Sequence, residues 1–317
     1  MAGRRQKKSG RRSYAWRYRG RIVACVFVEV IIICALVIMI GWNKGVKEWF
    51  EQFEQPVLKE VDISGINSPN AILMQARGGK ILGEINGEAQ IYPASMTKIM
   101  TVILGIENFD NLDEKITLTD EMFAGLYEQD ATQAGFQPGE EVRVIDLLYG
   151  AMLPSGAECC IALADTISGS EADFAELMNK KARKLGMENT HFCDSTGLHN
   201  PDHYSTVKDI AVLMKYCIKN DTFREIVETS RHSTGVTNIH PDGITYYSTM
   251  FKNLSDPTVT GGKILGGKTG YTSEAGHCLV SFAEIEGREY IFVSAGASGA
   301  DGNLSLIHIS EPTRRSY

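Results

Sequence analysis

The order in which hydrophobic patterns follow one another constrains the fold of this chain more than any other feature of its sequence. Residues 71–90 alternate apolar and polar side chains around two dipeptides typical of β-hairpins, Gly78-Gly79 and Asn86-Gly87. From Ser95 the apolar residues recur with helical spacing, and further helices are predicted at 142–153, 158–167, 171–186 and 207–220. After residue 245 the strand pattern returns, with another hairpin at residues 286–287. Strands at both ends and helices between them predict an α+β fold, a sheet covered by helices.

An apolar stretch near the N-terminus, residues 22–42, is long enough to cross a bilayer as a helix of about 20 residues. Residues 1–21 carry nine Lys or Arg and no acidic residue, so we predict a basic cytoplasmic head and a single-pass transmembrane anchor. A cleavable signal peptide is the alternative, but the following sequence, GWNKGVKEWF, is a poor cleavage site. We interpret residues 43–67 as a stalk that carries an extracellular domain of a membrane protein.

The charge distribution argues against one class of partner. The net charge of −7 combines the basic head with a remainder of 23 basic and 39 acidic residues. A nucleic-acid-binding domain needs a basic face, so we predict no nucleic-acid partner for the main domain.

The last residues of the chain have an unusual sequence. Residues 304–314, LSLIHISEPTR, resemble the translation of a transposon-end adapter used in sequencing libraries. We therefore expect residues 304–317 not to be biological, and the natural protein to continue past Asn303; a natural polar tail is the alternative. On this interpretation the exported domain, residues 68–303, is truncated.

The cysteine pattern does not indicate a disulfide framework. Two of the seven cysteines, Cys25 and Cys34, lie in the apolar stretch, which leaves an odd number in the exported part. We expect the remaining five to be mostly buried free thiols: Cys159, Cys160, Cys193, Cys217 and Cys278.

A serine and a lysine three residues apart, Ser95 and Lys98, stand at the start of the first predicted helix, in YPASMTKIM. Residues i and i+3 of a helix share a face, so the hydroxyl would lie beside the amine. Serine becomes a nucleophile when a base takes its proton, and lysine is a base only when neutral. Burial and a second cation lower a lysine pKa, so the pair predicts an activated serine. A capping serine beside a solvated lysine is the alternative for this short motif.

A second motif, Lys268-Thr269-Gly270, lies on a predicted strand and makes the first more specific. A strand edge can hold an extended peptide, and Gly270 allows a substrate backbone to approach closely. Lys268 could bind a carboxylate or bias the pKa of Lys98. The two motifs in this order are a signature of penicillin-binding proteins and class A β-lactamases.

The chain resembles the low-molecular-mass penicillin-binding proteins, the serine-type D-alanyl-D-alanine carboxypeptidases, from about residue 68 to residue 299. The segments that carry the resemblance are YPASMTKIMT (92–101), NTHFCDSTGLHNPDHYSTVKDIAVLM (189–214) and GGKTGYTSEAGHCLV (266–280). The resemblance implies a β-lactamase/transpeptidase-like α+β fold, with a mixed five-stranded antiparallel sheet flanked by helices and a helical subdomain.

The resemblance also implies roles for individual residues. Ser95 would be the nucleophile and Lys98 its base, and the backbone N–H groups of Ser95 and Tyr271 would form an oxyanion hole. Lys268 and Thr269, together with Gly270, would hold the terminal carboxylate and backbone of the substrate.

The family's second motif departs from its usual form of serine, any residue, asparagine. In LPSGAECC (153–160), Ser155 is in place, but Ala157 stands where the asparagine is expected. The loss of a buried polar partner costs about 1–3 kcal/mol. Glu158 or a water could replace the missing contacts, or the site could bind without turnover.

The predicted activity is removal of the terminal D-alanine from peptidoglycan stem peptides through an acyl-serine intermediate, with β-lactams as inhibitors. One alternative is a catalytically impaired cell-wall-binding protein, which Ala157 favours. The other is a β-lactamase, which needs a dedicated deacylating carboxylate that the sequence does not indicate. His199 and His203 are four residues apart, but Pro201 separates them and no third ligand is evident, so we predict no metal and no cofactor.

Overall fold

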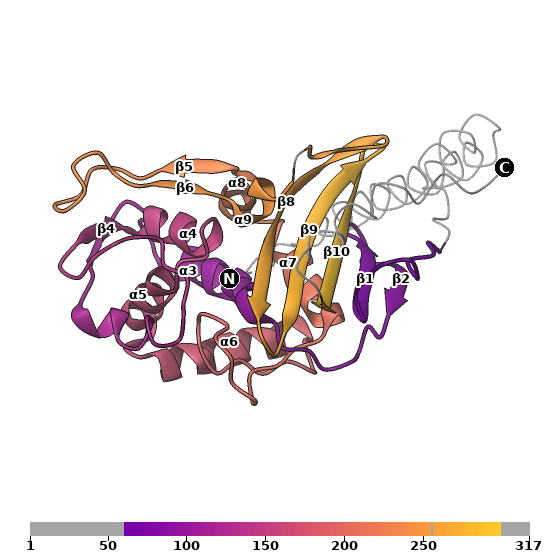
Figure 1. Cartoon of the computed structure of the whole chain (residues 1–317), viewed down its shortest axis with the longest axis horizontal. Helices are drawn as coiled ribbons and strands as arrows, with labels where there is room; N and C mark the ends of the chain where they lie inside the picture. The colour runs from indigo at the N-terminus through magenta and orange to yellow at the C-terminus, as the bar shows by residue number, and fades with distance from the viewer. Residues whose placement is uncertain (1–59, 255, 299–317) are drawn as a thin grey trace, which may run out of the picture. The chain divides into compact units, whose positions relative to one another are not determined.

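The computed structural model describes residues 60–254 and 256–298, which form a sheet with helices packed on it (Figure 1). The sheet has six strands in the order β2-β1-β10-β9-β8-β7. Their bounds are Asn70–Gln75 (β1), Ile81–Ile85 (β2), Thr258–Val259 (β7), Gly262–Thr272 (β8), Gly276–Ile285 (β9) and Arg288–Ala297 (β10). The first and last parts of the described chain therefore meet, because β1 pairs with β10.

The predicted α+β class and the predicted antiparallel pairing are confirmed, but the sheet is neither mixed nor five-stranded. All its strand pairs are antiparallel, and the two-residue β7 adds a sixth strand by folding back onto the start of β8. A two-residue strand has too few side chains to show an alternating pattern, so the sequence gives no sign of it.

Two of the three predicted hairpins are confirmed. Gly78-Gly79 joins β1 to β2, and both glycines have positive φ, 84° and 75°. Glu286-Gly287 joins β9 to β10 in the same way. Asn86-Gly87 does not join two strands: the chain leaves β2 there, and Ile91 then forms an isolated bridge with Ser205.

The helices follow the predicted ranges closely, except that the helix predicted from residue 142 begins at Val144, since 141–143 pair as a strand. Helix α6 (Glu171–Leu185) is capped at its start by the Ser170 hydroxyl, which accepts from the Asp173 amide, and Gly186 follows its end in the left-handed conformation. The main helices are Lys98–Asn108 (α3), Val144–Met152 (α4), Ala157–Ser168 (α5), Glu171–Leu185 (α6), Val207–Cys217 (α7), Asp221–Glu228 (α8) and Thr249–Lys252 (α9). Shorter elements are Ala94–Thr97 (η1), Lys115–Thr117 (β3), Asp120–Phe123 (η2), Glu141–Arg143 (β4), Arg231–Ser233 (β5) and Thr245–Tyr247 (β6).

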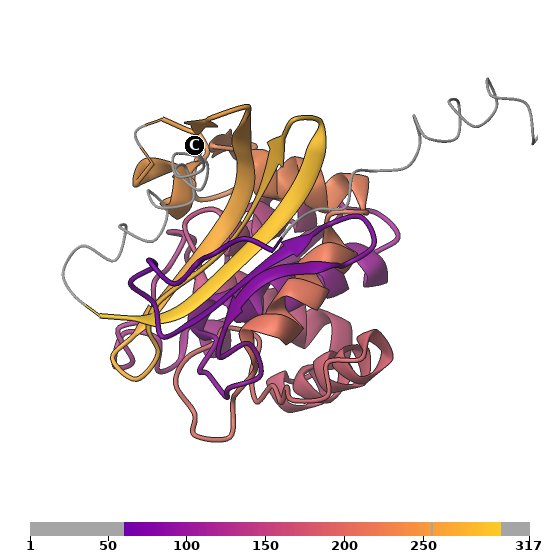
Figure 2. The same cartoon turned by 90° about the vertical axis from the view of Figure 1, so that its right-hand side faces the viewer.

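Helix α3 lies at the centre of the helical part and carries the first motif. Its residues from Lys98 to Gly105 are all buried, and it packs against α4, α5 and α7. Helix α7 packs against β1 and β10, and α8 packs against β8, so one face of the sheet is covered by helices (Figure 2). The first turn of α3 is thereby held between the helical part and the sheet.

The described chain contacts the sheet from Val61 onward, ahead of the predicted domain start at Ser68: the Val61 amide donates to the Leu82 carbonyl, 2.6 Å away. The predicted head, membrane anchor and C-terminal tail lie outside the described residues, as does the stalk up to residue 59. Within 60–298, apart from residue 255, no helix combines the length and the apolar run needed to cross a membrane. The expected free thiols are confirmed, four of them buried and Cys193 half-buried.

Candidate active site

The turn that holds Ser95 is η1, which leads directly into α3. Ala94, just before the serine, has a φ of +47°, a conformation that a residue with a side chain rarely adopts. Ser95 Oγ lies 3.0 Å from Lys98 Nζ, and the lysine side chain is buried. The predicted contact between hydroxyl and amine is present.

The loop between α4 and α5 brings Ser155 to the same point. Its Oγ donates to Ser95 Oγ at 3.0 Å and accepts from Lys268 Nζ, also at 3.0 Å. Ser155 has a φ of +74°, and such strain costs about 1–3 kcal/mol in a residue other than glycine. The surrounding structure holds this serine in place. An unbroken chain of four polar groups therefore runs from Lys98 through the two hydroxyls to Lys268.

Strand β8 supplies the other wall of the site. Lys268 Nζ also donates to the Thr269 carbonyl at 2.9 Å, and the Thr269 hydroxyl lies 2.7 Å from that of Thr249. In the described chain β7 pairs only with residues 262 and 263, so the rest of this edge of β8 carries no paired strand. A Cβ on Gly270 would lie 2.9 Å from the Ser95 nitrogen, so only a glycine permits this approach.

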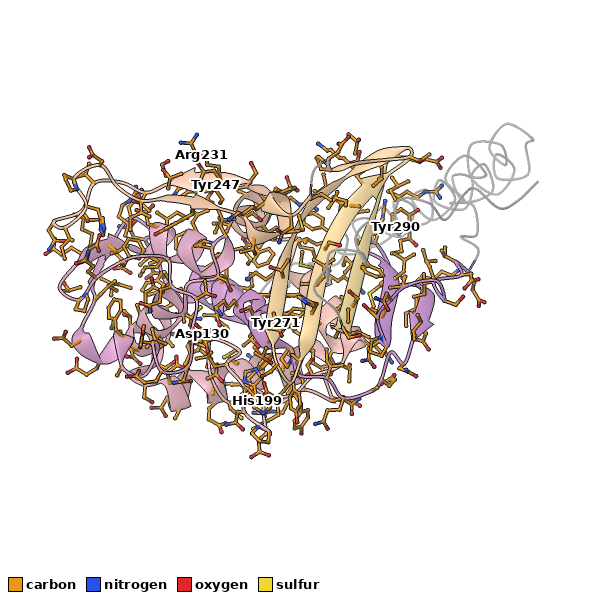
Figure 3. All side chains as sticks on the ribbon, in the orientation of Figure 1. Asp130, His199, Arg231, Tyr247, Tyr271 and Tyr290 are labelled. Carbon is orange, nitrogen blue, oxygen red and sulfur yellow. The ribbon has the colours of Figure 1, made fainter. Side chains whose placement is uncertain are left out.

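A cavity of about 790 Å³ opens beside these groups. Ser95, Ser155 and Gly270 line it, together with the end of β8. Figure 3 shows Asp130 and His199, two further lining residues, near the end of β8 that carries the 62 % exposed Tyr271. The cavity has room for an extended peptide along the unpaired part of the β8 edge.

Both buried amines of the site have lowered pKa values. Burial lowers the pKa of Lys98 from its ordinary value of 10.5, although Asp194 and Glu158 act in the opposite direction. Burial, and then the neighbouring Lys98 amine, hold the pKa of Lys268 well below the same value. A lowered amine pKa increases the neutral fraction, which is the form that can take a proton from serine.

The second acceptor for Lys98 is a group that the sequence does not reveal. Lys98 Nζ donates to the backbone carbonyl of Thr196 at 2.6 Å. Thr196 belongs to the central segment, residues 189–214, which the resemblance singled out without assigning it a contact. A backbone carbonyl has no side-chain signature, and only the turn-forming Asp194-Ser195-Thr196-Gly197 could have hinted at it.

The departure from the second motif is visible at the start of α5. Ala157 is buried at 1 % exposure and offers no polar group. Glu158 does not take over the contacts of an asparagine amide with Lys98: its Oε1 accepts from the Ala134 and Gly135 amides at 2.6 and 2.9 Å. This carboxylate secures the loop before β4, and Thr196 provides the acceptor for Lys98.

The two histidines considered as metal ligands take part in other contacts. Both ring nitrogens of the buried His203 are engaged, Nε2 with the Thr97 hydroxyl and Nδ1 with Asp194. His199 packs edge-on against the Tyr92 ring, and its Nδ1 lies 3.9 Å from a Glu274 carboxylate oxygen.

A serine hydroxyl between a buried amine and a second hydroxyl, beside a peptide-sized cavity, is an arrangement suited to acyl transfer. A family model described as D-alanyl-D-alanine carboxypeptidase (peptidase S11) matches residues 57–299. The chain belongs to this family.

Curated relatives support the assignment. DacF of Bacillus subtilis, a D-alanyl-D-alanine carboxypeptidase, is 35% identical over 233 residues, which cover 72% of this chain and 57% of DacF. DacC of Escherichia coli, which has the same description, is 33% identical over 261 residues, which cover 75% of this chain and 58% of DacC. The chain thus spans less than two thirds of these relatives.

Solved structures show the same fold. A serine-to-alanine mutant of the Streptomyces DD-transpeptidase aligns with a TM-score of 0.70 at 29% identity, covering 77% of this chain and 96% of that one. Penicillin binding protein 5 from Haemophilus influenzae aligns with a TM-score of 0.69 at 27% identity, covering 78% and 70%. The transpeptidase-like α+β fold is confirmed.

Proposed function

We propose that this chain is a serine D-alanyl-D-alanine carboxypeptidase that removes the terminal D-alanine of peptidoglycan stem peptides and is inhibited by β-lactams. The observation that carries the proposal is the position of Ser95 Oγ, 3.0 Å from both Lys98 Nζ and Ser155 Oγ. The family assignment supports it, as do the activities named for the relatives.

In the proposed reaction, neutral Lys98 takes the Ser95 proton as Oγ attacks the carbonyl between the two D-alanines. The backbone N–H groups of Ser95 and Tyr271 stabilise the oxyanion. The C–N bond then breaks, and the proton reaches the departing amine through Ser155. Water hydrolyses the resulting ester and restores the serine.

Substrate binding falls to β8. Lys268 and Thr269 hold the terminal carboxylate, and Gly270 lets the peptide backbone lie against the strand edge. The role proposed for Lys268 is therefore in binding, while burial and the neighbouring Lys98 amine lower the pKa of Lys268 itself.

The proposed location follows from the N-terminal sequence. Residues 22–42 act as a membrane anchor and residues 1–21 as a cytoplasmic head, so the catalytic domain lies outside the membrane, next to the cell wall. Residues 43–67 connect the two as a stalk.

Intact mass after incubation of the full chain with benzylpenicillin tests the nucleophile. We expect an adduct on the wild-type chain and on Ser233→Ala, a matched control on β5, and none on Ser95→Ala. No adduct on folded wild-type chain would refute the proposal.

A penicillin-binding protein that is acylated but does not turn over is the second candidate, because Ala157 removes a polar group from the site. Release of D-alanine from a stem-peptide mimic separates the two. The carboxypeptidase proposal expects release by the wild-type chain and none by Ser95→Ala. An adduct with benzylpenicillin but no release would favour the second candidate.

A further inference from the structure

We infer that Asp194, His203 and Thr97 are positioning residues for the proposed reaction: they hold the carbonyl of Thr196 on the amine of Lys98. The inference rests on the proposed function and deepens it, since it assigns a role to the central segment. None of the three is expected to touch the reacting atoms.

One oxygen of Asp194 shapes the turn that presents the carbonyl. Its Oδ1 accepts from the Thr196 amide, the Thr196 hydroxyl and the Gly197 amide, each at 2.7 Å. Three donors on a single carboxylate oxygen leave the turn few alternative conformations. The Thr196 carbonyl then points at Lys98 Nζ, 2.6 Å away.

The other oxygen of Asp194 ties the turn back to the nucleophile. Its Oδ2 lies 3.1 Å from His203 Nδ1, a ring nitrogen that also lies 3.3 Å from the Cys193 amide of the same segment. The opposite nitrogen, Nε2, lies 2.9 Å from the hydroxyl of Thr97, which stands between Ser95 and Lys98 in the chain. These contacts form a closed circuit of hydrogen bonds, which runs from Lys98 through the turn at Thr196, Asp194 and His203 to Thr97, the residue before Lys98.

Packing leaves this circuit little freedom. His203 is 2 % exposed, and Thr97 is fully buried. A Cβ on Gly197 would lie 1.9 Å from the Ala94 carbonyl oxygen, so the turn rests directly on the backbone that precedes Ser95. Any displacement of the turn would therefore also disturb the serine.

The chemical consequence concerns the lone pair of the base. A neutral amine has two N–H donors and one lone pair. If one N–H is bound to the Thr196 carbonyl, rotation about the terminal C–N bond is restricted and the lone pair can be directed at Ser95 Oγ. A lysine without this acceptor would have several rotamers available, and few of them would be productive.

The charge of Asp194 has a second effect. The ionisable groups that face Lys98 are Cys159, Cys160 and Glu158 on α5, Asp194 on the central segment, and Lys268 on β8. The carboxylate of Asp194 raises the pKa of Lys98 against the larger effect of burial. Removal of this charge, with the shape kept, should lower that pKa.

Acylation by benzylpenicillin, followed over a pH series on the full chain, tests the inference. Asp194→Ala should slow acylation at saturating drug by about 10- to 100-fold, with a much smaller change in drug affinity. Asp194→Asn should restore part of the rate and move the acid limb of the pH profile to lower pH. Asp209→Asn is the matched control: this carboxylate binds the Asn189 amide and the Thr190 hydroxyl of the same segment, without a link to Lys98.

A crystal structure of Asp194→Ala in the Ser95→Ala background gives a measure that is independent of activity. We expect the Thr196 carbonyl to leave Lys98 Nζ. A carbonyl that stays within hydrogen-bond distance, or acylation no slower than in Asp209→Asn, would overturn the inference. Absence of acylation in the wild-type chain would instead refute the proposed function, and the crystal structure would still decide the positioning role.

Discussion

Replacement of Gly270 by alanine should move β8 away from Ser95 while the side chains of Lys268 and Thr269 are retained. The added methyl group would lie 2.9 Å from the Ser95 nitrogen and 3.1 Å from the Ala94 Cβ. Ordinary contact begins near 3.4 Å, so the strand must retreat from the nucleophile by about 0.5 Å. A misplacement of about 1 Å can cost 10²-fold in rate, so half that distance predicts a loss of about tenfold. Lys268, two residues away, should weaken its contact with Ser155 at the same time.

The assay is the rate of acylation by benzylpenicillin at saturating drug, with the melting temperature measured in parallel. Gly262→Ala is the matched control, because it creates a worse clash, 1.7 Å from the Glu284 carbonyl oxygen, at the far end of the same strand. We expect Gly262→Ala to lower the melting temperature while the folded fraction still reacts at the wild-type rate. Gly270→Ala should instead react about tenfold more slowly while it keeps its melting temperature. Acylation of folded Gly270→Ala at the wild-type rate would refute the view that β8 must lie this close to Ser95.

Three further predictions concern protons. Ser155→Ala removes the link between Ser95 and Lys268, so release of D-alanine from a stem-peptide mimic should fall by about 10²- to 10⁴-fold, the usual contribution of a proton-transfer group; an unchanged rate would exclude Ser155 from the relay. In the wild-type chain, acylation should become faster with rising pH and level off below pH 10.5, because the base is neutral Lys98 and burial lowers its pKa; a rate that falls over this range would exclude Lys98 as the base. Burial alone would raise the pKa of Asp194, but hydrogen bonds led by that of His203 lower it from 3.8 to about 2. The ionised carboxylate therefore stabilises the folded state fully above pH 3.8, and this stabilisation is lost as the pH falls through 2. Urea unfolding should show this loss, about 2 kcal/mol at 1.36 kcal/mol per pKa unit, in wild type and not in Asp194→Asn; equal acid sensitivity of the two would contradict it.

The parts of the fold that the sequence predicted are those with a local signal. Alternation identified the long strands, and helical spacing identified α3 to α7, because each pattern repeats over many residues. Asn86-Gly87 was misleading: the dipeptide favours a turn, but whether a second strand follows depends on Ile91, whose bridge to Ser205 is a tertiary contact. The hairpin of β5 and β6 was not predicted, since two three-residue strands are too short for a pattern.

In the site, too, only the contact with a local sequence signal could be predicted. The contact between Ser95 and Lys98 follows from their spacing on a helix, and it is present at 3.0 Å. The Thr196 carbonyl could not be predicted, because any residue carries such a group and only the folded turn directs it. The suggestion that Glu158 replaces the missing asparagine was plausible from chain proximity, yet its Oε1 binds the loop at residues 134–135.

The site combines several features that oppose folding, and this explains why its surroundings are so tightly packed. Lys98 and Lys268 are 4 % and 1 % exposed, and an effective desolvation penalty of several kcal/mol applies to each buried ammonium. Ser155 adds backbone strain of about 1–3 kcal/mol. A fold can keep such groups only if rigid neighbours leave them no relaxed alternative, and α3 provides that rigidity because its first eight residues are all buried. The penalty for a buried charge also disappears when an amine is neutral, so the packing that makes Lys98 costly as an ammonium also favours the neutral form that its proposed role as a base requires.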